Sequence, residues 1–419
     1  MIHKRALTAT LITIGDELLI GQVIDTNSAW IGRALSQNGI QVARRIAIAD
    51  SREAITTALD TELAAVDLIL ITGGLGPTAD DITKPTLADY FGGGMRTDAA
   101  VLAHVTDFFR KRNKPMLERN LRQAEVPQNC TVLFNQSGTA PGMWFEKEGK
   151  IVVSMPGVPH EMIHLMETQV LPRLKERFAL KPLLYRNLLL GGEGESFVAE
   201  LIRDLEEELP LHIRLAYLPS LGFLRLRLTC NESDRTGVEA EMDGWCDAIA
   251  TRLGSYLLAT QDAGFPEILA KILTERGLKL GLAESCTGGY IAHLQTQVPG
   301  ASQYLRGSLV CYDPEAKIRL LGVSPQSIAK HGIVSETVAR EMAMGAANAL
   351  KADMGFGITG WLEGEGDDHA PGGTVCMAVA MGNRMESKTF RFANDRIRNK
   401  ELAAQNALIF LIRFLKAQA

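Results

Sequence analysis

Hydrophobic and polar positions alternate between two periods along the first 90 residues. Short apolar runs at 7–14, 41–48 and 67–72 predict strands. Between them, the segments 26–38 and 52–65 place apolar residues at helical spacing, so they predict amphipathic helices. Such alternation of strands and helices is typical of right-handed βαβ units, whose parallel sheet is covered on both faces.

The pattern changes at about residue 175. Before it, a helix at 99–112 and a strand at 151–154 extend the first domain. After it, the segments 182–190 and 223–230 predict half-exposed strands around a helix at 195–209, and 223–230 alternates leucine with arginine. Half-exposed strands beside one helix indicate a small α+β domain.

The alternation of strands and helices resumes beyond residue 259 and closes with an amphipathic helix at 399–417. The apolar face of this last helix could be buried against a second subunit, which predicts a homodimer. That face comprises Leu402, Leu408, Ile409, Ile412 and Leu415. We predict three domains, at 1–175, 176–258 and 259–419. The predicted fold class is α/β, with two three-layer α/β domains whose sheets are rich in parallel strands, joined by the small α+β domain.

Composition narrows the class of protein. The 419 residues are 46% hydrophobic and 22% charged with a net charge of −5, and no basic stretch could neutralise many phosphates, so we expect no nucleic-acid partner. The N-terminus is too short and too rich in threonine for a signal peptide, and no apolar run reaches the roughly 18 residues of a membrane span. The six cysteines form no C-x-x-C pair, which argues against a structural zinc site or a disulfide framework. We therefore expect a cytoplasmic protein.

The seven residues 283–289, Ala-Glu-Ser-Cys-Thr-Gly-Gly, carry the densest chemistry of the third domain. They follow a strand-like run and precede a helix that starts at Tyr290. Glycines let backbone N–H groups approach a ligand, and a helix N-terminus favours an anion. Ser285 or Cys286 is a candidate nucleophile or phosphate-binding group. The alternative is a polar turn with a threonine that caps the helix.

Tyr312 and Lys317 supply candidate bases. Serine alone is a poor nucleophile at neutral pH, so a lysine or tyrosine brought near Ser285 could activate it. Taken by itself, the same segment predicts only a strand end and a helix start, with Pro314 at the first helical position.

Two further signals in the third domain are weaker. Residues 355–360 satisfy G-x-G-x-x-G, but the pattern lies inside a strand and an acidic loop follows it, so we interpret it as accidental. Thr359 and Gly360, at the end of that strand, remain candidates to line a site. Arg396 and Arg398 could hold a phosphate bidentately, or they could be solvated charges beside the last helix.

Glycines and aspartates follow the buried strand of the first domain. They are Gly73, Gly74, Gly76, Asp80 and Asp81. The glycines can surround a phosphate with N–H donors, and the paired aspartates can hold a divalent cation. Ordinary turns use the same residue types, but the carboxyl end of a strand is where ligands bind in such sheets, which favours a functional loop.

Other polar residues of the first domain allow more than one interpretation. Asp16 and Asp25 add carboxylates at a neighbouring strand end, where either a site or a helix cap would explain a carboxylate. His160, Glu161 and His164 match the zinc-protease pattern H-E-x-x-H. The match directly follows a loop rich in proline and glycine, which leaves no preceding helical turn, so we interpret it as a chance match.

Together these segments resemble the competence/damage-inducible CinA family over essentially the whole chain. In the first domain the resemblance rests on 15–19, 25–27, 72–83, 138–142 and 156–162, and in the third on 283–289, 298–302, 312–317, 320–323, 331–335 and 372–375.

The resemblance implies a different activity for each of the two larger domains. The first looks like a molybdopterin-binding (MogA/MoeA-like) fold used as an ADP-ribose pyrophosphatase, with a divalent metal such as magnesium and help from potassium. The third looks like a nicotinamide mononucleotide deamidase, which releases ammonia to give nicotinate mononucleotide and needs no cofactor. Small nucleotides would then be the partners of both domains.

The resemblance also assigns roles to residues. Ser285 would be the nucleophile, with Tyr312 and Lys317 assisting. Substrate binding would fall to Thr287, Gly288, Gly289, Ser302, Thr359, Gly360 and an arginine, Arg396 or Arg398. In the first domain, Gly73, Gly74 and Gly76 would bind substrate, and Asp16, Asp25, Asp80 and Asp81 would bind metal.

The chain departs from the family pattern at two places. Asp313-Pro314 replaces the usual Ser-Asn, and a bulky acidic loop at 361–368 replaces a glycine-rich one. Carboxylates repel a nearby phosphate unless a cation intervenes. One alternative is therefore a pyrophosphatase whose third domain is degenerate and serves dimerisation or ligand sensing. Another is a pterin-binding or competence-associated scaffold without enzymatic activity.

Overall fold

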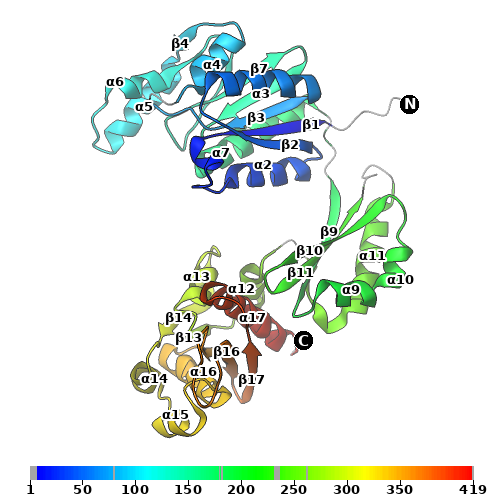
Figure 1. Ribbon diagram of the computed structural model, residues 1–419, viewed down its shortest axis with the longest axis vertical. Coiled ribbons are helices and arrows are strands. Elements are labelled where there is room, and N and C mark those ends of the chain that lie inside the picture. The colour runs from blue at the N-terminus through cyan, green and yellow to red at the C-terminus, as the bar shows by residue number, and fades with distance from the viewer. Residues whose placement is uncertain are drawn as a thin grey trace. The chain divides into compact units, whose positions relative to one another are not determined.

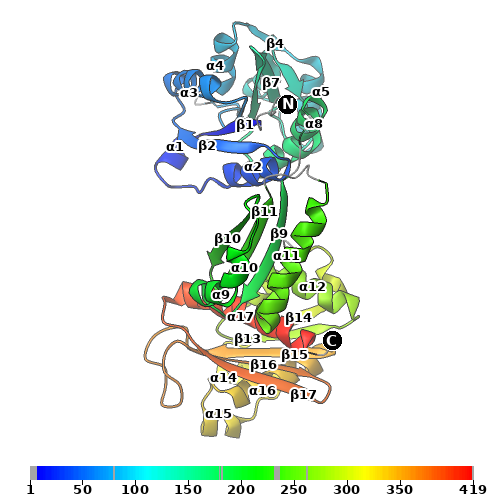
Figure 2. The same cartoon turned by 90° about the vertical axis from the view of Figure 1, so that its right-hand side faces the viewer.

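The computed structural model describes residues 7–78, 81–178, 180, 183–230, 236–260 and 263–417. The chain divides into two compact units, 1–183 and 184–419, which are shown in Figures 1 and 2. Asp80, one of the predicted metal ligands, lies outside the described residues, as does Pro182 at the start of a predicted strand.

The first unit is built on a six-stranded sheet. In spatial order its strands are β2 (Gln41–Ile48), β1 (Thr8–Ile14), β3 (Leu68–Thr72), β8 (Lys150–Met155), β7 (Gly142–Lys147) and β6 (Thr131–Leu133). The first four are parallel, β7 pairs antiparallel with β8, and β6 at the edge pairs antiparallel with β7 and so runs in the same direction as the first four.

Helices cover both faces of this sheet (Figure 1). They are α1 (Asp16–Leu19), α2 (Thr26–Gln37), α3 (Arg52–Ala65), α4 (Thr83–Tyr90), α5 (Ala99–Lys111), α6 (Glu118–Leu121), η1 (Arg122–Ala124), α7 (Pro159–Leu165), η2 (Met166–Val170) and α8 (Leu171–Arg177), with a separate ribbon of β4 (Met95–Thr97) and β5 (Glu125–Pro127). Side chains of β3 alternate between two cores: Leu68 and Leu70 pack with α2 and α7, and Ile69 and Ile71 pack with α3. This confirms the predicted α/β class.

The second unit begins with a small antiparallel sheet. Its strands, in spatial order, are β10 (Ile213–Ser220), β11 (Phe223–Cys230), β9 (Leu184–Gly191) and β12 (Leu257–Ala259). Its helices are α9 (Glu195–Leu201), α10 (Arg203–Glu207), α11 (Val238–Leu253) and η3 (Gly254–Tyr256). The helix predicted at 195–209 is interrupted at Ile202, whose φ of −116° is not helical.

The remainder of the second unit is a five-stranded sheet with helices around it. The strands, in spatial order, are β14 (Leu305–Val310), β13 (Leu280–Glu284), β15 (Met354–Gly360), β16 (Thr374–Met381) and β17 (Arg384–Arg391). The helices are α12 (Phe265–Glu275), α13 (Tyr290–Thr296), η4 (Ala301–Gln303), α14 (Pro314–Leu321), α15 (Pro325–His331), α16 (Glu336–Leu350) and α17 (Arg396–Lys416). The strands β14, β13 and β15 are parallel, β16 pairs antiparallel with β15, and β17 pairs antiparallel with β16 and so runs in the same direction as β15.

The apolar face of α17 is covered within its own unit. Leu408, Ile412 and Leu415 are fully buried in one core with residues of α12 and β16. The prediction that this face packs against a second subunit is therefore wrong, because α12 and the sheet of the same unit already bury four of its five residues, all but Leu402.

Glycines bring α16 close to β15. A Cβ atom added to Gly355 would lie 1.9 Å from the carbonyl oxygen of Ala343, and one added to Gly357 would lie 2.4 Å from that of Ala339. The G-x-G-x-x-G string therefore serves contact between a helix backbone and a strand. It lies within β15, as the sequence indicated.

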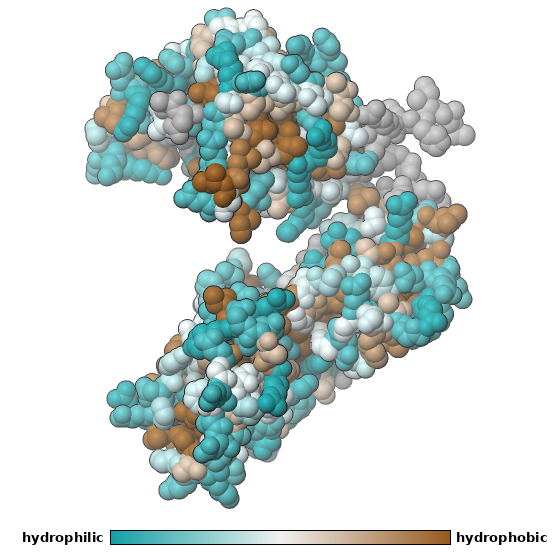
Figure 3. Space-filling model, in the orientation of Figure 1, coloured by the Kyte–Doolittle hydropathy of each residue, from teal (hydrophilic) through white to brown (hydrophobic). Residues whose placement is uncertain are grey.

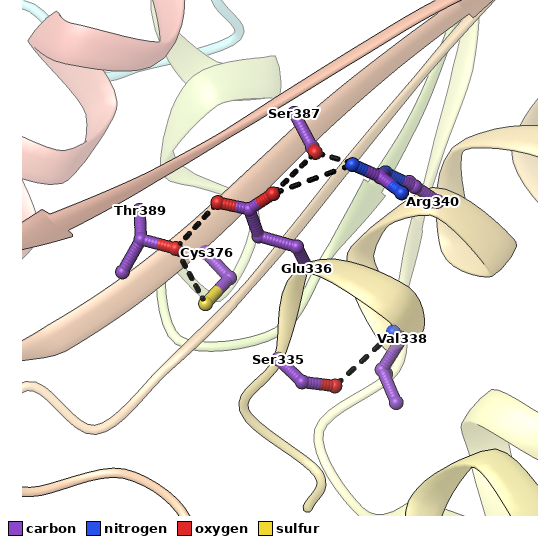
Figure 4. Close-up of polar contacts among 7 residues, drawn as sticks. All are labelled: Ser335, Glu336, Val338, Arg340, Cys376, Ser387 and Thr389. Carbon is purple, nitrogen blue, oxygen red and sulfur yellow. Dashed lines mark hydrogen bonds and ion pairs between the residues drawn. The ribbon is translucent and has the colours of Figure 1, made fainter. Parts of the chain in front are cut away.

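A polar cluster ties the start of α16 to β17 (Figure 4). Ser387 and Thr389 donate hydrogen bonds of 2.6 and 2.8 Å to the Glu336 carboxylate. The hydrogen bonds from Ser387 and Thr389, together with nearby Arg340, hold the pKa of Glu336 below its usual value. The cluster fixes the helix that crosses the middle of the sheet.

Hydrophobic side chains reach the surface of the first unit (Figure 3). The largest run lies in and after α1 and comprises Leu19, Ile20, Val23 and Ile24. Among the described residues, no helix combines the length and apolar character needed to cross a membrane.

Candidate active sites

Ser285 and Lys317 meet in the second unit. Ser285 directly follows β13, and Lys317 lies in α14. The Lys317 Nζ atom donates a 2.9 Å hydrogen bond to Ser285 Oγ and a 2.8 Å bond to the carbonyl of Cys311. Both side chains are buried, with exposed fractions of 6% and 1%. The sequence offered Lys317 as a partner of Ser285, and the structure brings the two together.

The surroundings of Lys317 favour its neutral amine. Burial lowers its pKa below the ordinary lysine value, and the charges of Cys311, Cys286 and Asp313 oppose that shift only in part. Asp313 caps α14 by accepting a 2.8 Å hydrogen bond from the N–H of Ala316, and Pro314 takes the first helical position. Asp313 and Pro314, which differ from the family pattern, therefore begin the helix that holds Lys317 beside Ser285.

Cys286 is a poor rival to Ser285. Its side chain packs into the apolar core of the second unit, and burial raises the pKa of its thiol to about 12. A thiol is nucleophilic as the thiolate, which such a pKa nearly removes at neutral pH. The geometry therefore favours Ser285 as the nucleophile.

Glu284 occupies the helix N-terminus that was predicted to hold a ligand. Its fully buried carboxylate accepts hydrogen bonds from the N–H groups of Gly289, Ile291 and Ala292 at 3.1, 3.0 and 2.9 Å, and from Ser308 Oγ at 3.0 Å. The chain thus supplies the anion that the first turn of α13 attracts. No role was predicted for Glu284, although a carboxylate at the end of an apolar strand often caps the helix that follows.

A cavity of about 120 Å³ opens beside Ser285. Its lining comprises Ser285, Cys286, Tyr312, Lys317, Ile333, Val334, Thr359, Gly360, Trp361, Leu362, Glu363 and Arg396. Pockets that enclose a whole drug-sized ligand measure roughly 300–1,000 Å³, so this one encloses only part of a nucleotide. Six of the predicted site residues therefore surround one small space.

Other predicted site residues lie elsewhere. Thr287, Gly288 and Gly289 are outside the cavity lining, and the N–H groups of the two glycines bond to Ser285 O and to Glu284. Ser302 lies exposed in η4, and Arg398 is exposed at the start of α17, neither of them lining the cavity. Their contact with substrate stays a prediction.

Arg396 links Tyr312 to the acidic loop at the mouth of the cavity. Its Nη2 atom donates a 2.7 Å hydrogen bond to the Tyr312 hydroxyl, and its Nη1 atom lies 3.5 Å from Glu363 Oε1. Thr359 is held by a 3.0 Å bond from its hydroxyl to the carbonyl of Ile333. Tyr312 therefore contacts the predicted phosphate-binding arginine, and the structure shows no hydrogen bond between its hydroxyl and Ser285.

In the first unit, the predicted glycine loop folds around Asp81. The N–H of Gly76 donates a 2.7 Å bond to Asp81 Oδ1, and Thr78 N donates a 2.9 Å bond to Oδ2. Gly73 has a φ of +111°, and Gly74 approaches Thr83 so closely that an added Cβ would lie 2.0 Å from its hydroxyl oxygen. Asp81 therefore organises the loop.

Lys84 lies at the start of α4, beside this loop, and the sequence analysis missed it. It is 6% exposed, and its Nζ atom donates a 2.9 Å bond to the carbonyl of Gln123. Burial lowers the pKa of Lys84 to about 8, against the opposing charges of Glu125 and Asp81. Within the described part of the chain, the buried hydroxyls of Thr83 and Thr86 have no hydrogen-bond partner. A buried amine and unpaired hydroxyls beside a glycine loop are features of a ligand site.

The predicted metal ligands do not converge in the described residues. Asp25 caps α2 through Ser28 N and accepts the hydroxyl of Thr13, so it acts as a helix cap. Asp16 lies beside Asp50, whose pKa is raised by burial and by neighbouring carboxylates that include Asp16 and Asp81. Across the described ranges, no three His, Cys, Asp or Glu side chains are placed to hold a metal ion. These residues therefore do not fit a metal by themselves, and Asp80 is not described.

The H-E-x-x-H string has another use. Glu161 accepts a 2.7 Å hydrogen bond from Asn135 Nδ2, which ties α7 to the loop before β7. His160 is exposed on the first turn of α7, and the described residues show no zinc site there.

Three families match consecutive parts of the chain. Residues 10–176 match the family described as "Probable molybdopterin binding domain", residues 185–259 match "Damage-inducible protein CinA KH domain", and residues 263–415 match "CinA C-terminal domain".

Two of the relatives match nearly the whole chain. A "CinA-like protein" of Flavobacterium psychrophilum is 41% identical over 408 residues, which cover 96% of this chain and 97% of the relative. A "CinA-like protein" of Chloroherpeton thalassium is 40% identical over 98% of this chain and 100% of its own. Among solved structures, a CinA protein of Thermoplasma acidophilum, described as of unknown function, is 35% identical, with 41% of this chain and 98% of its own covered and a TM-score of 0.37.

Proposed function

The chain belongs to the CinA family, and we propose that Ser285 and Lys317 hydrolyse the carboxamide of nicotinamide mononucleotide to nicotinate mononucleotide and ammonia. The observation that carries the proposal is the 2.9 Å contact between a buried lysine amine and a buried serine hydroxyl at the wall of a cavity. A desolvated amine next to a hydroxyl has the geometry of a general base with its nucleophile.

The chemistry follows from that pair. The neutral Lys317 amine takes the proton of Ser285, and Oγ attacks the carboxamide carbon. Lys317 then returns the proton to the departing nitrogen, and the C–N bond breaks. Ammonia leaves, and the acyl group remains on Ser285 as an ester. A water molecule, deprotonated by the same amine, cleaves the ester, and the proton returns to Ser285.

Replacement of Ser285 by alanine tests the proposal. We expect ammonia release from nicotinamide mononucleotide to fall at least about 10³-fold, because the nucleophile is removed and no covalent intermediate forms. The coupled assay for ammonia is run with Cys286→Ala as the matched control, which should retain activity. Wild-type protein that is folded and releases no ammonia would sink the proposal.

We further propose that the first unit hydrolyses the pyrophosphate bond of ADP-ribose. This activity would use a divalent metal such as magnesium, with help from potassium. The support is Lys84, a buried amine next to the glycine loop and to two buried hydroxyls. An amine in this position can neutralise a phosphate oxygen. Since the described carboxylates form no metal site by themselves, no step is assigned to the metal.

Replacement of Lys84 by methionine tests the second activity. We expect AMP formation from ADP-ribose to fall about 100-fold, since a positive charge beside the phosphates is lost while the apolar stem is kept. Chromatographic measurement of AMP is paired with Lys111→Met, an exposed lysine of α5. Unchanged AMP formation in Lys84→Met would exclude this role.

The same two assays separate the alternatives. AMP formation without ammonia release would support a pyrophosphatase whose third domain serves dimerisation or ligand sensing, and the Glu363–Arg396 pair is the observation that favours it. Pterin binding without either activity would support a scaffold. We also propose a cytoplasmic location and a homodimer, whose interface would not be the apolar face of α17. Light scattering, which measures the molar mass in solution, tests the dimer.

A further inference from the structure

The mouth of the Ser285 cavity carries a carboxylate. Glu363 lines the cavity, and its Oε1 atom lies 3.5 Å from Arg396 Nη1. Arg396 also donates to the Tyr312 hydroxyl, so both sides of its guanidinium are engaged within the chain. The cationic group that would meet a phosphate is therefore already paired with an anion.

Backbone contacts keep the loop of Glu363 in place. The N–H of Trp361 donates to the carbonyl of Thr374 at 2.9 Å, and that of Gly373 donates to the carbonyl of Trp361 at 2.8 Å. The buried amide of Asn399 donates a 2.6 Å bond to the carbonyl of Leu362. With both residues before it anchored, Glu363 can change rotamer but its backbone stays at the cavity mouth.

We propose that Glu363 is a specificity-determining residue that weakens phosphate binding at Arg396 and admits an unphosphorylated carboxamide nucleoside, nicotinamide riboside, as a second substrate. This inference rests on the amidohydrolase proposed above. Nicotinamide riboside and nicotinamide mononucleotide carry the same positive pyridinium ring, which a carboxylate attracts, but the riboside has no phosphate. The same carboxylate repels the phosphate of nicotinamide mononucleotide.

The effect comes from charge at the mouth and not from the strength of the ion pair. Both partners are about half exposed, with side-chain exposures of 52% for Glu363 and 48% for Arg396. Exposed ion pairs contribute little to stability, so a ligand can displace Glu363 from Arg396. The repulsion between the displaced carboxylate and a phosphate remains, because the two groups share the same small opening, and salt reduces it.

Glu363→Gln tests this proposal, with Glu365→Gln as the matched control. Glu365 lies on the same loop, is exposed and does not line the cavity. Two quantities are measured at low and high salt. One is the kcat/KM for ammonia release from nicotinamide mononucleotide and from nicotinamide riboside. The other is the Kd of ribose 5-phosphate by calorimetry, which probes the phosphate without any chemistry.

We expect Glu363→Gln to bind ribose 5-phosphate about tenfold more tightly and to lower the KM for nicotinamide mononucleotide by a similar factor. The KM for nicotinamide riboside should stay the same or rise, and Glu365→Gln should change none of these values. Equal effects on both substrates, or an unchanged Kd of ribose 5-phosphate, would overturn the role of Glu363. If no variant releases ammonia, the amidohydrolase fails, and the calorimetry still decides whether Glu363 opposes phosphate.

Discussion

Lys317→Met is expected to reduce kcat for ammonia release from nicotinamide mononucleotide about 10³-fold, with little change in KM. Methionine keeps the length of the side chain in a site where lysine is 1% exposed, but it cannot accept the proton of Ser285. The binding surface near Arg396 is unaltered, so ground-state affinity should persist. Steady-state kinetics with the ammonia assay measure both constants.

The pH profile adds a test that a purely structural lysine would fail. Burial lowers the pKa of Lys317, so its neutral, proton-accepting form appears at a lower pH than in an ordinary lysine. The rate of ammonia release should therefore rise as the pH increases through this lowered pKa. This rise should be absent in Lys317→Met. Lys317→Arg should not rescue the rate, since a guanidinium keeps its proton. Two results would contradict the role of Lys317 as a base. One is a wild-type rate that does not change with pH below the ordinary pKa of lysine, and the other is an active Lys317→Arg.

Glu284→Ala is expected to destabilise the second unit by about 3 kcal/mol. The substitution leaves three N–H groups at the start of α13 and the hydroxyl of Ser308 without their acceptor, in a place where the carboxylate is fully buried. For a unit of this size, the thermal midpoint should fall by roughly 6–12 °C. Circular dichroism during heating measures it.

A suitable control for Glu284 is Glu275→Ala, since Glu275 is 63% exposed and is paired only loosely with Lys271. Its midpoint should change by no more than a degree or two. Similar thermal midpoints for Glu284→Ala and Glu275→Ala would contradict this prediction. They would show that water replaces the Glu284 carboxylate with little loss of stability.

The regular elements were readable because their periodicity is local. The helix α3 and the strands β2 and β11 begin and end where the apolar pattern placed them. The strands β6 and β7 were missed because their local patterns do not identify them, although each pairs with the next strand along the chain. The strand β6 has only three residues, and β7 is an apolar run followed by two charges, without alternation. The break at Ile202 was missed for a similar reason, since α9 and α10 both pack on the sheet with one apolar stripe.

The candidate sites were readable to a smaller extent. The loop at 283–289 and Lys317 could be singled out from residue types at a strand end and at the helix start that follows the next strand. The pairing of Glu363 with Arg396 joins residues 33 positions apart, and only the pairing of β15, β16 and β17 brings the two together. Lys84 was overlooked because a lysine in a helix is usually a solvated charge, and the carbonyl that satisfies its buried amine belongs to Gln123 in η1, 39 positions further along the chain.

The glycines of β15 have a consequence for how such strings are interpreted in other sequences. With Gly355 and Gly357 both facing the backbone of α16, two successive positions on one face of the strand lack a side chain. Glycine at alternate positions inside a strand can thus identify the helix that crosses it, just as a hydrophobic stripe identifies a core. In a sequence without a structure, this spacing would indicate which face of a strand lies closest to the helix layer. At those positions even a single added methyl group should be tolerated least.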